Sequence, residues 1–480
     1  MQENRIRARV HNNYRYATWI VVASCLLLCL ATLNYNGPFF DEGIYITAGI
    51  RTLEGAAETD RFLTWFGGSL LWPVLAGLGY RASGLIGTRA VAAVVTVGGL
   101  GAFAQAVRNI FGAKTGFWAT LGLALNGPFL ALARLGVYDT LALSLTAVAL
   151  WAITELKQRD HRGWLGVSAA AFSVAVFAKY PIAIMALPLL GTLLLLRNDR
   201  ASTDIFLFVF LAGALGLVVF LPLRDQVAQF FSWRLDNRPT FGVPLRGIIL
   251  TIVYSSIIPL ILALAGWFIV RRKRGLASLM LLSLAIWPTY HLITEDPVST
   301  SKHLVFGYLF AYPLVGVTLG TIWGNARSHL LRRTLAVFVV AVLAGVGLLQ
   351  VNQSDHSWPD ARPGAGFLVA RVQRGDKLAI NDSWPYIMYL YTAGRIDSPG
   401  EVYDEYRITH EEWTPPICEY DWFVDTRGTL AWPEEFLEQK TQCSTFEEVF
   451  STTSQVIQLG AAGNYVSNPV ETIVWKNTAE

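Results

Sequence analysis

Residues 40–51 read FDEGIYITAGIR, and this stretch decides how the rest of the chain is interpreted. It follows an apolar run, residues 17–33, that is long enough to cross the roughly 30 Å of hydrocarbon in a bilayer as a helix. Two adjacent carboxylates, Asp41 and Glu42, therefore emerge where the chain leaves this run, and the spacing after them predicts an amphipathic helix. Acidic residues also favour the positive end of a helix dipole, so a purely structural role for the pair stays open at this point.

The composition of the whole chain is that of a membrane protein. Of its 480 residues, 53% are hydrophobic and only 15% are charged, and the mean hydropathy is +0.41. Soluble domains contain about 25% charged residues, which disfavours an ordinary cytosolic enzyme. The excess positive charge lies in short loops between apolar runs, so we expect no nucleic acid partner.

Apolar runs of sufficient length recur along the first three quarters of the sequence. A membrane helix needs about 17–25 predominantly apolar residues. The sequence therefore predicts a polytopic α-helical membrane protein with about eleven transmembrane helices. We expect them at residues 17–33, 85–107, 116–133, 139–156, 163–178, 182–196, 205–222, 247–270, 276–293, 304–323 and 334–350.

The charge of the connecting loops indicates whether a further apolar stretch, residues 62–80, also crosses. If it does not, the loops on one side carry 18 Lys and Arg in 53 residues, and those on the other side carry 10 in 93. If it does, the basic residues 271–274 move to the outer side, against the tendency of Lys and Arg to stay in the cytoplasm. We therefore expect residues 62–80 to be interfacial or re-entrant, within a first outer loop at residues 34–84.

The last part of the chain differs from the rest in charge. Residues 1–351 contain 29 Lys and Arg against 15 Asp and Glu, net +14, whereas residues 352–480 contain 9 against 20, net −11. Loop parity places this acidic tail on the outer side as well. Turn residues in the tail separate a helical stretch near 384–393 from strand-like runs at 377–381, 421–426 and 471–475. We expect a transmembrane catalytic domain at residues 1–351 and a small soluble α/β domain at residues 352–480.

Four cysteines are present, two in the first apolar run and two in the tail. Cys25 and Cys29 fit as small apolar side chains within a membrane helix. A disulfide between Cys418 and Cys443 requires an oxidising compartment. We expect this pair to form if the tail lies outside the cell membrane.

Five residues around the acidic pair resemble the first outer loop of the GT-C glycosyltransferases. One branch of that superfamily contains the dolichyl-phosphate-mannose–protein mannosyltransferases and the lipid A aminoarabinose transferases. In it, Asp-Glu follows the first span, a Tyr comes three residues after the Glu, and a small and a basic residue follow. Asp41, Glu42, Tyr45, Ala48 and Arg51 match these positions. The resemblance implies a GT-C-like fold with interfacial helices in the first outer loop.

Residues at the outer ends of later spans are similar to the same family. Arg134 and Asp139 match an Arg and an Asp between its third and fourth spans, and Lys179 matches a Lys at the outer end of its fifth. Lys302 and His303 resemble a basic pair ahead of a late span that contains a proline. Two structural explanations stay open: Asp139 as a helix cap, and the cations as side chains that extend to lipid head groups.

The resemblance implies an inverting glycosyltransferase of the plasma membrane with its active site on the outer side. It would move a sugar from a polyprenyl-phosphate donor to a glycan, lipid or protein acceptor, surrounded by membrane lipids. A polyprenyl phosphate is already a good leaving group, so the reaction needs a base for the acceptor hydroxyl and cations for the departing phosphate.

The resemblance also implies a role for each matched residue. Asp41 is the expected base, and Glu42 and Asp139 are expected to orient hydroxyl groups of the substrates. The expected substrate-binding residues are Tyr45, Arg51, Arg134, Lys179, Lys302 and His303. No cofactor is required; a distant GT-C branch uses a divalent metal, so the resemblance allows a divalent cation without requiring one.

The main alternative is a polytopic transporter or a flippase for lipid-linked sugars. Transporters usually place ionisable residues near the middle of the membrane and contain inverted repeats. This sequence has few such residues inside its apolar runs and no visible repeat. Ten of the 15 acidic residues in the first 351 fall on the predicted outer face, which favours chemistry on that side. A scaffold whose tail binds partners gives no reason for this clustering.

Overall fold

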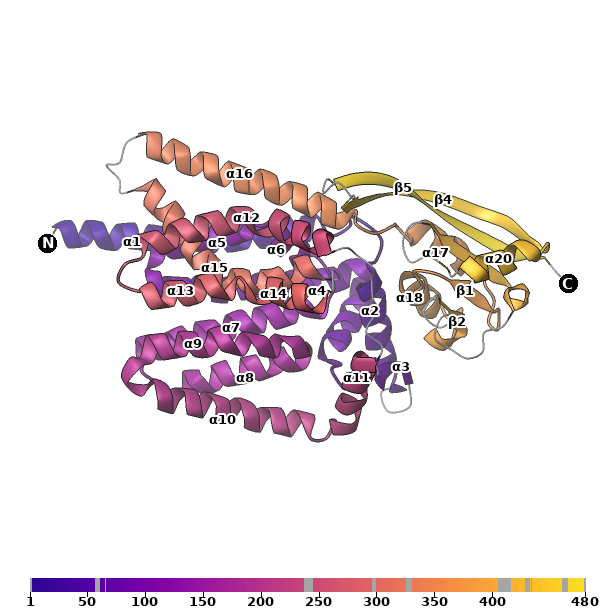
Figure 1. The fold of residues 1–480 in the computed structure, drawn as a ribbon, viewed down its shortest axis with the longest axis horizontal. Coiled ribbons are helices and arrows are strands. Elements are labelled where there is room, and N and C mark those ends of the chain that lie inside the picture. Colours follow the sequence, from indigo (N-terminus) through magenta and orange to yellow (C-terminus); the bar gives the residue numbers. More distant parts are fainter. Residues whose placement is uncertain are drawn as a thin grey trace. The chain divides into compact units, whose positions relative to one another are not determined.

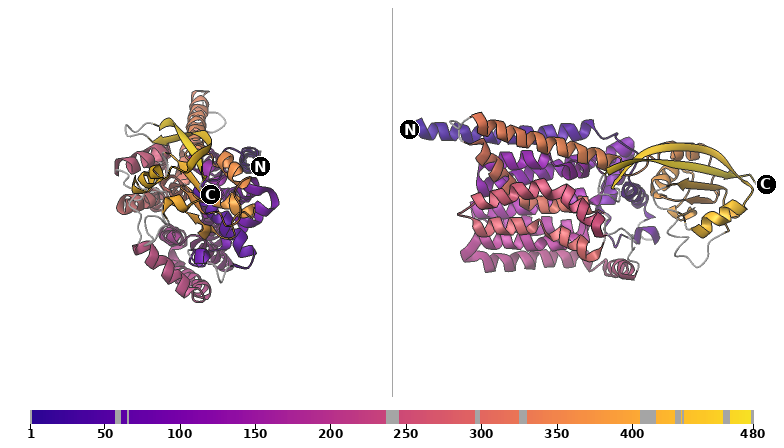
Figure 2. Two further views of the ribbon diagram at one scale, coloured as in Figure 1. Left: turned by 90° about the vertical axis from the view of Figure 1, so that its right-hand side faces the viewer. Right: turned by 45° about the horizontal axis from the view of Figure 1, so that its top comes forward.

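The computed structural model describes most of the chain (Figures 1 and 2). The described residues are 2–56, 61–64, 66–236, 245–295, 299–324, 330–404, 416–427, 432, 434–459 and 465–478. The chain divides into two compact units. Unit 1 comprises Met1–Leu33, Phe66–Ser69 and Ala90–Asn352, and unit 2 comprises Asn34–Trp65, Leu70–Arg89 and Gln353–Glu480. A boundary thus follows residue 352, whereas most of the first outer loop, expected within the transmembrane domain, groups with the C-terminal residues.

Unit 1 is helical, and its long helices are aligned along one direction (Figure 1). Its elements are α1 (Gln2–Ala31), residues 90–111 of α4 (Leu71–Phe111), α5 (Ala113–Ala124), α6 (Gly127–Ala133), α7 (Tyr138–Arg159), α8 (Gly163–Ala178), η2 (Tyr180–Met185), α9 (Ala186–Arg197), η3 (Asn198–Arg200), α10 (Ala201–Phe220), α11 (Arg224–Asp236), α12 (Leu245–Ile269), α13 (Arg274–Ser283), α14 (Ile286–Thr294), α15 (Thr300–Trp323) and most of α16 (Leu330–Asp355).

Eight helical segments among the described residues are long and apolar enough to cross a membrane, or nine if the bent pair α5 and α6 counts as one span. One of the eight, Tyr180–Phe220, turns back at Asn198, where φ is 36°, so that α9 and α10 lie side by side (Figure 1). A shorter apolar helix, α8, adds to them. Each predicted span overlaps one of these helices. The prediction of a polytopic helical membrane protein is therefore confirmed.

Residues 62–80 form short segments instead of one straight helix. The helix α3 (Arg61–Thr64) is followed by a turn in which Gly67 and Gly68 have φ values of 56° and 82°. The long helix α4 then begins, but Ser83 and Gly84 interrupt it with non-helical backbone angles. Gly84 has a φ of 62°, a conformation that glycine adopts without the penalty of a side chain. Residues 71–89 of α4 belong to unit 2 and residues 90–111 belong to unit 1, so the boundary between the units follows this break by one to two turns.

The core of unit 1 is built around α15, the most buried of its candidate spans. Small residues let neighbouring helices approach closely, as is common between membrane helices. A Cβ atom at Gly316 would lie 2.6 Å from the carbonyl oxygen of Thr115 on α5, and a Cβ at Gly266 of α12 would meet the backbone of Leu314. These two contacts fix the position of α15, whose first turn carries Lys302 and His303.

Unit 2 contains the predicted α/β domain, with a five-stranded mixed sheet in its described residues, in the order β2-β1-β3-β5-β4. Strands β2, β1 and β3 are parallel, and β5 is antiparallel to both β3 and β4. Figure 2 shows β4 and β5 as a long curved ribbon. The elements of the tail are α17 (Arg362–Val369), β1 (Leu378–Ile380), α18 (Trp384–Thr392), η4 (Pro399–Glu401), β2 (Val402–Tyr403), η5 (Ile417–Glu419), β3 (Trp422–Thr426), α20 (Glu434–Gln442), β4 (Phe446–Leu459) and β5 (Tyr465–Asn477).

Both faces of this sheet are covered by helices. Phe367 of α17 stacks on Phe450 at 4.7 Å on one face, and Phe436 of α20 lies 6.0 Å from Phe423 on the other. A disulfide joins Cys418 and Cys443, whose Cα atoms are 5.6 Å apart, at the edge of the core around Phe423. The predicted cysteine pairing is thus confirmed. Cys25 and Cys29 are free and buried in unit 1.

The helix α2 (Phe40–Leu53) packs inside unit 2 between two other helices. A Cβ at Gly43 would lie 2.5 Å from the carbonyl oxygen of Trp384 on α18, and a Cβ at Gly49 would meet the backbone of Pro73 in the first part of α4. All residues from 42 to 50 are buried. The sequence predicted an amphipathic helix here, and that prediction is wrong, because both sides of α2 face protein in this unit.

Candidate active site

Asp41 and Glu42 lie in the first turn of α2, but their environments differ. Asp41 is half-buried, whereas Glu42 is completely buried. The backbone N–H of Phe39, which caps the helix, donates to Oε2 of Glu42 at 2.9 Å. The side chain of Glu42 thus caps the N-terminal turn of its own helix. Asp41 is the more accessible carboxylate of the pair.

The partner of Glu42 is Arg89, which the sequence analysis missed. Arg89 donates from Nε to Oε1 of Glu42 at 2.9 Å and from Nη2 to Oε2 at 2.8 Å. It also donates to the carbonyl oxygens of Asn36 and Gly37, and its guanidinium lies 4.1 Å from the ring centre of Tyr35. A lone arginine within the predicted apolar run 85–107 was the available signal, since a charge in such a run needs a partner.

This pairing changes the role that fits Glu42. Both of its carboxylate oxygens accept hydrogen bonds from Arg89, and neither side chain is more than 1% exposed. The expected role in orienting substrate hydroxyls would need an oxygen directed at the substrate. The geometry instead fits a residue that holds the segment 36–42, and with it the backbone of Asp41, in place.

Tyr45 and Arg51 lie further along the same helix. Tyr45 is buried. Arg51 donates from Nη1 to the carbonyl oxygen of Asp397 at 2.8 Å, and its guanidinium lies 5.2 Å from the ring centre of Tyr391. Both contacts of Arg51 tie the end of α2 to the C-terminal part of unit 2.

In unit 1 the structure brings together three residues that the sequence predicted for the site. Asp139 lies in the first turn of α7, Lys179 ends α8, and His303 lies in the first turn of α15. The ammonium group of Lys179 donates to Oδ1 of Asp139 and lies 2.7 Å from Nε2 of His303. It also lies 4.7 Å from the ring centre of Tyr138. All three charged or polar side chains are at most 8% exposed.

A second histidine, His291 of α14, extends this cluster and was missed from the sequence. Its Nε2 lies 2.9 Å from Nδ1 of His303. An ammonium group can only donate, so Nε2 of His303 accepts from Lys179, and a neutral His303 carries its proton on Nδ1. That proton is donated to Nε2 of His291. The hydrogen bonds therefore run in one direction, from Lys179 through His303 to His291.

The two remaining predicted cations lie in unit 1 with different surroundings. Arg134 is buried at the end of α6 and donates from Nη1 to the carbonyl and hydroxyl oxygens of Thr32, each at 3.3 Å. Arg134 thus connects the end of the first helix to the α6–α7 turn. Lys302 is half-buried, beside His303 in the first turn of α15.

The donor set of the described residues does not fit a metal ion. Within the described part of the chain, no group of three or more His, Cys, Asp or Glu converges as ligands. The carboxylates of Asp139 and Glu42 face the cations of Lys179 and Arg89, where a metal ion would meet like charge.

The helical bundle, with an acidic pair after its first helix, and the sheet-containing C-terminal part have the elements of the GT-C-like fold that the sequence predicted. The chain is similar over 95% of its length to ArnT from Cupriavidus metallidurans in the apo state, with 97% of that chain covered, a TM-score of 0.60 and 16% sequence identity. ArnT bound to undecaprenyl phosphate gives a TM-score of 0.58 at 15% identity, again with coverages of 95% and 97%.

Further comparisons give the same fold. The Archaeoglobus fulgidus oligosaccharyltransferase in the apo form matches with a TM-score of 0.54 and 11% identity, over 94% of this chain and 74% of that one. Residues 73–224 match the family described as dolichyl-phosphate-mannose-protein mannosyltransferase. No curated protein matches the chain. The GT-C resemblance predicted from the sequence is confirmed by these matches.

Proposed function

We propose that the chain is an inverting glycosyltransferase that uses a polyprenyl-phosphate-linked sugar as its donor. The fold supports this, because two structures that share it were determined with undecaprenyl phosphate and with a tethered acceptor peptide, respectively. The observation that carries the proposal is the buried ammonium group of Lys179, held between Asp139 and His303. Such a fixed cation suits a phosphate that gains charge during the reaction.

Lys179 has three N–H groups, and two of them are directed at Asp139 and His303. The third is available to an oxygen of the donor phosphate. Asp139 keeps the ammonium group charged, and His303 fixes its direction. During transfer the bond between the sugar carbon and the phosphate oxygen breaks, and its electron pair stays on the phosphate. A positioned cation stabilises this developing charge more than it stabilises the donor in the ground state.

Asp41 is the proposed base for the acceptor. As the acceptor oxygen forms its bond to the sugar carbon, its proton passes to the carboxylate of Asp41. Attack opposite to the departing phosphate inverts the configuration of the sugar carbon. Glu42 and Arg89 act as positioning residues, because they hold the turn that carries Asp41 and are themselves buried.

The remaining predicted residues take supporting roles in this proposal. Arg134, Lys302 and His303 are further candidate ligands of the donor phosphate, while Tyr45 and Arg51 hold α2. We propose that the reaction and the C-terminal domain lie on the outer side of the plasma membrane, and the charge of the loops supports this orientation. The acceptor class is a glycan, a lipid or a protein.

A transfer assay with a panel of donors tests the proposal. The purified full-length protein, reconstituted in vesicles, is incubated with radiolabelled polyprenyl-phosphate sugars and with cell-envelope extract as the source of acceptor. We expect one donor to yield labelled acceptor and free polyprenyl phosphate in equal amounts. A flippase would move the intact donor across the vesicle membrane without releasing polyprenyl phosphate, and that result would contradict the proposal.

A further inference from the structure

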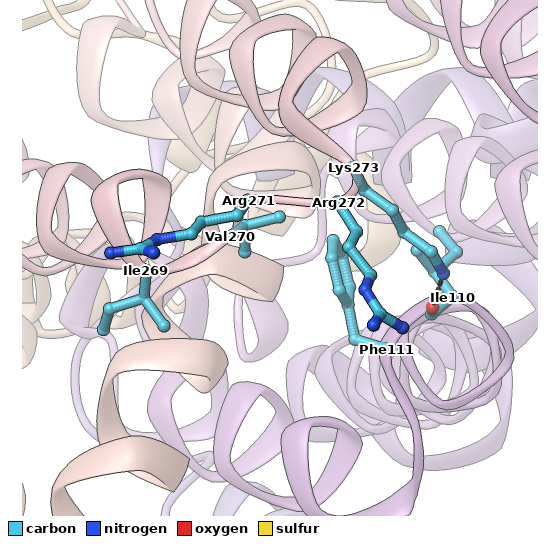
Figure 3. A pocket seen from close by; sticks show the side chains of 7 residues that line it. All are labelled: Ile110, Phe111, Ile269, Val270, Arg271, Arg272 and Lys273. Atoms are coloured by element: carbon cyan, nitrogen blue, oxygen red, sulfur yellow. Dashed lines mark hydrogen bonds between the residues drawn. The ribbon is translucent and has the colours of Figure 1, made fainter.

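A basic cavity lies at the turn between α12 and α13 and shares no residue with the candidate active site. It has a volume of about 420 Å³. Its charged lining is Arg271, Arg272 and Lys273, and its apolar walls include Phe111 and Ile269. Figure 3 shows the side chains of Arg272 and Lys273 extending toward Phe111 and Ile110, whereas Arg271 extends toward Ile269.

A second cavity of about 420 Å³ adjoins the first and shares Arg272 and Lys273 with it. It adds two further cations, Lys157 and Arg274, and neutral hydrogen-bonding side chains such as Asn109. Every charged residue that lines either cavity is basic. Positive charge is therefore concentrated here without an acidic side chain in the lining to balance it.

Two of these cations have a structural task. Lys273 donates from Nζ to the carbonyl oxygen of Ile110, near the end of α4. Arg274 donates to the carbonyl oxygen of Trp267, near the end of α12, and stacks at 3.7 Å on the Trp267 ring. They satisfy carbonyl groups that the ends of helices leave without partners.

Arg271 and Arg272 have no comparable task. Both are exposed, and neither forms a hydrogen bond or an ion pair with any residue that the structure describes. Burial lowers the pKa of Lys273, and the neighbouring positive charge of Lys157, in the last turn of α7, lowers it further. A bound anion would relieve this repulsion.

The exposed apolar residues beside the cavity favour an anion that also has an apolar part. The turn connects two helices that are each long and apolar enough to cross a membrane. Next to the cavity, Ile269 is 41% exposed and Phe268 is 65% exposed. Basic pockets between membrane helices are known binding places for the head groups of anionic lipids.

We propose that these two cavities bind the phosphate head group of an anionic phospholipid, with Arg272 and Lys273 on the phosphate and the acyl chains along Ile269 and Phe268. Arg271 adds positive charge on the lipid-facing side. The site does not depend on the proposed glycosyl transfer, because no residue of the transfer site lines it.

Native mass spectrometry of the full-length protein, titrated with phosphatidylglycerol or phosphatidylcholine, tests this site. We expect the wild-type protein to retain phosphatidylglycerol, and Arg272→Gln to bind it about tenfold more weakly, as for the loss of one charged hydrogen bond. The matched control is Arg332→Gln, at an exposed arginine in the first turn of α16, which should change the affinity by less than about twofold. A single substitution leaves three of the four basic residues at the turn, so the membrane orientation is retained.

Three outcomes would overturn the proposal. The first is equal affinity of the wild-type protein and Arg272→Gln for phosphatidylglycerol. The second is equal affinity of the wild-type protein for phosphatidylglycerol and phosphatidylcholine, since the latter has no net charge. The third is displacement of the lipid by millimolar inorganic phosphate, which would identify a site for free anions instead of lipids.

Discussion

The guanidinium of Arg89 donates two hydrogen bonds, of 2.9 and 2.8 Å, to the carboxylate of Glu42, and both residues are fully buried. Removing one partner of such a pair leaves a buried charge without compensation. The pair therefore bears on stability first and, in the proposed reaction, on the position of Asp41.

Glu42→Gln should destabilise the protein by about 3–5 kcal/mol, because Arg89 remains charged and buried. Thermal unfolding of the purified protein in detergent measures this. Glu54→Gln is the matched control at the C-terminal cap of the same helix, because Glu54 pairs with Arg81 at the surface and its substitution should cost at most about 1 kcal/mol. Glu42→Leu combined with Arg89→Met should recover much of the loss. Equal melting temperatures of Glu42→Gln and the wild-type protein would contradict the prediction.

Asp41→Asn should fold and bind the donor but lose most of its transfer rate. Asparagine keeps the shape of aspartate and cannot accept the proton, and a positioned base typically contributes about 10²–10⁴-fold. The rate of release of polyprenyl phosphate is the measurement. Asp225→Asn serves as the control, because Asp225 is 91% exposed on α11 and should leave the rate unchanged. Near-normal transfer by Asp41→Asn would show that the base lies elsewhere.

Lys179→Gln should weaken donor binding by about 1.5–3 kcal/mol, the contribution of a hydrogen bond to a charged group. Binding of a radiolabelled donor and of the acceptor are measured separately, and only the former should change. The control is Lys114→Gln, at a lysine that donates to the carbonyl oxygen of Gly324 elsewhere in unit 1. If both variants bind the donor as the wild-type protein does, Lys179 is not a phosphate ligand.

The direction of the hydrogen bonds through His303 is measurable by ¹⁵N NMR of its ring nitrogens. The wild-type protein should show a proton on Nδ1 of His303 and none on Nε2. His291→Leu removes the acceptor of that proton, so the preference for this tautomer should be lost and donor affinity should fall. His161→Gln, at an exposed histidine, should leave the His303 signals unchanged. A proton on Nε2 in the wild-type protein would reverse the proposed order of the hydrogen bonds.

Asp382 should make unit 2 less stable as the pH rises. It follows β1 with a φ of 48°, and burial raises its pKa from 3.8 to about 6. The folded state therefore binds more protons than the unfolded state between these values, so the free energy of unfolding falls between pH 4 and pH 6, by up to about 3 kcal/mol. Asp382→Asn should remove this pH dependence of the free energy of unfolding and stabilise the protein at pH 7, because asparagine carries no charge to bury. Asparagine also tolerates the positive φ at this position. The control is Asp397→Asn, at an exposed acid, which should keep the pH dependence of the wild-type protein. If the pH dependence persists in Asp382→Asn, another titrating group causes it.

Local sequence patterns were sufficient for most of the fold. Apolar runs located the membrane helices, because a helix that crosses lipid must be long and continuous. In the tail, the predicted runs at 377–381 and 421–426 coincide with β1 and β3, and the helical stretch at 384–393 coincides with α18. The strand β4 was not predicted, because its residues are largely polar and its apolar alternation is irregular.

The candidate site was only partly predictable. Asp139, Lys179 and His303 could be named from the family resemblance at the outer ends of the apolar runs, and the structure places them in contact. Arg89 contacts Glu42, which lies 47 residues earlier, and His291 contacts His303, which lies 12 residues later on a different helix; no local period reveals either contact. The burial of α2 has the same origin, since α18 lies more than 300 residues further along the chain.

That distance has a consequence for biosynthesis. The helix with the acidic pair finds its neighbour α18 only after unit 1 has been made, because the 263 residues between Arg89 and Gln353 come first. From the end of α2 at Leu53 to the start of α18 at Trp384 the ribosome adds 330 residues, so at about 5–20 residues per second α2 waits roughly 15–65 s for that neighbour. Throughout this interval a segment that is buried in the finished protein is exposed to chaperones and proteases, so synthesis of the C-terminal residues is the step that completes the packing of α2.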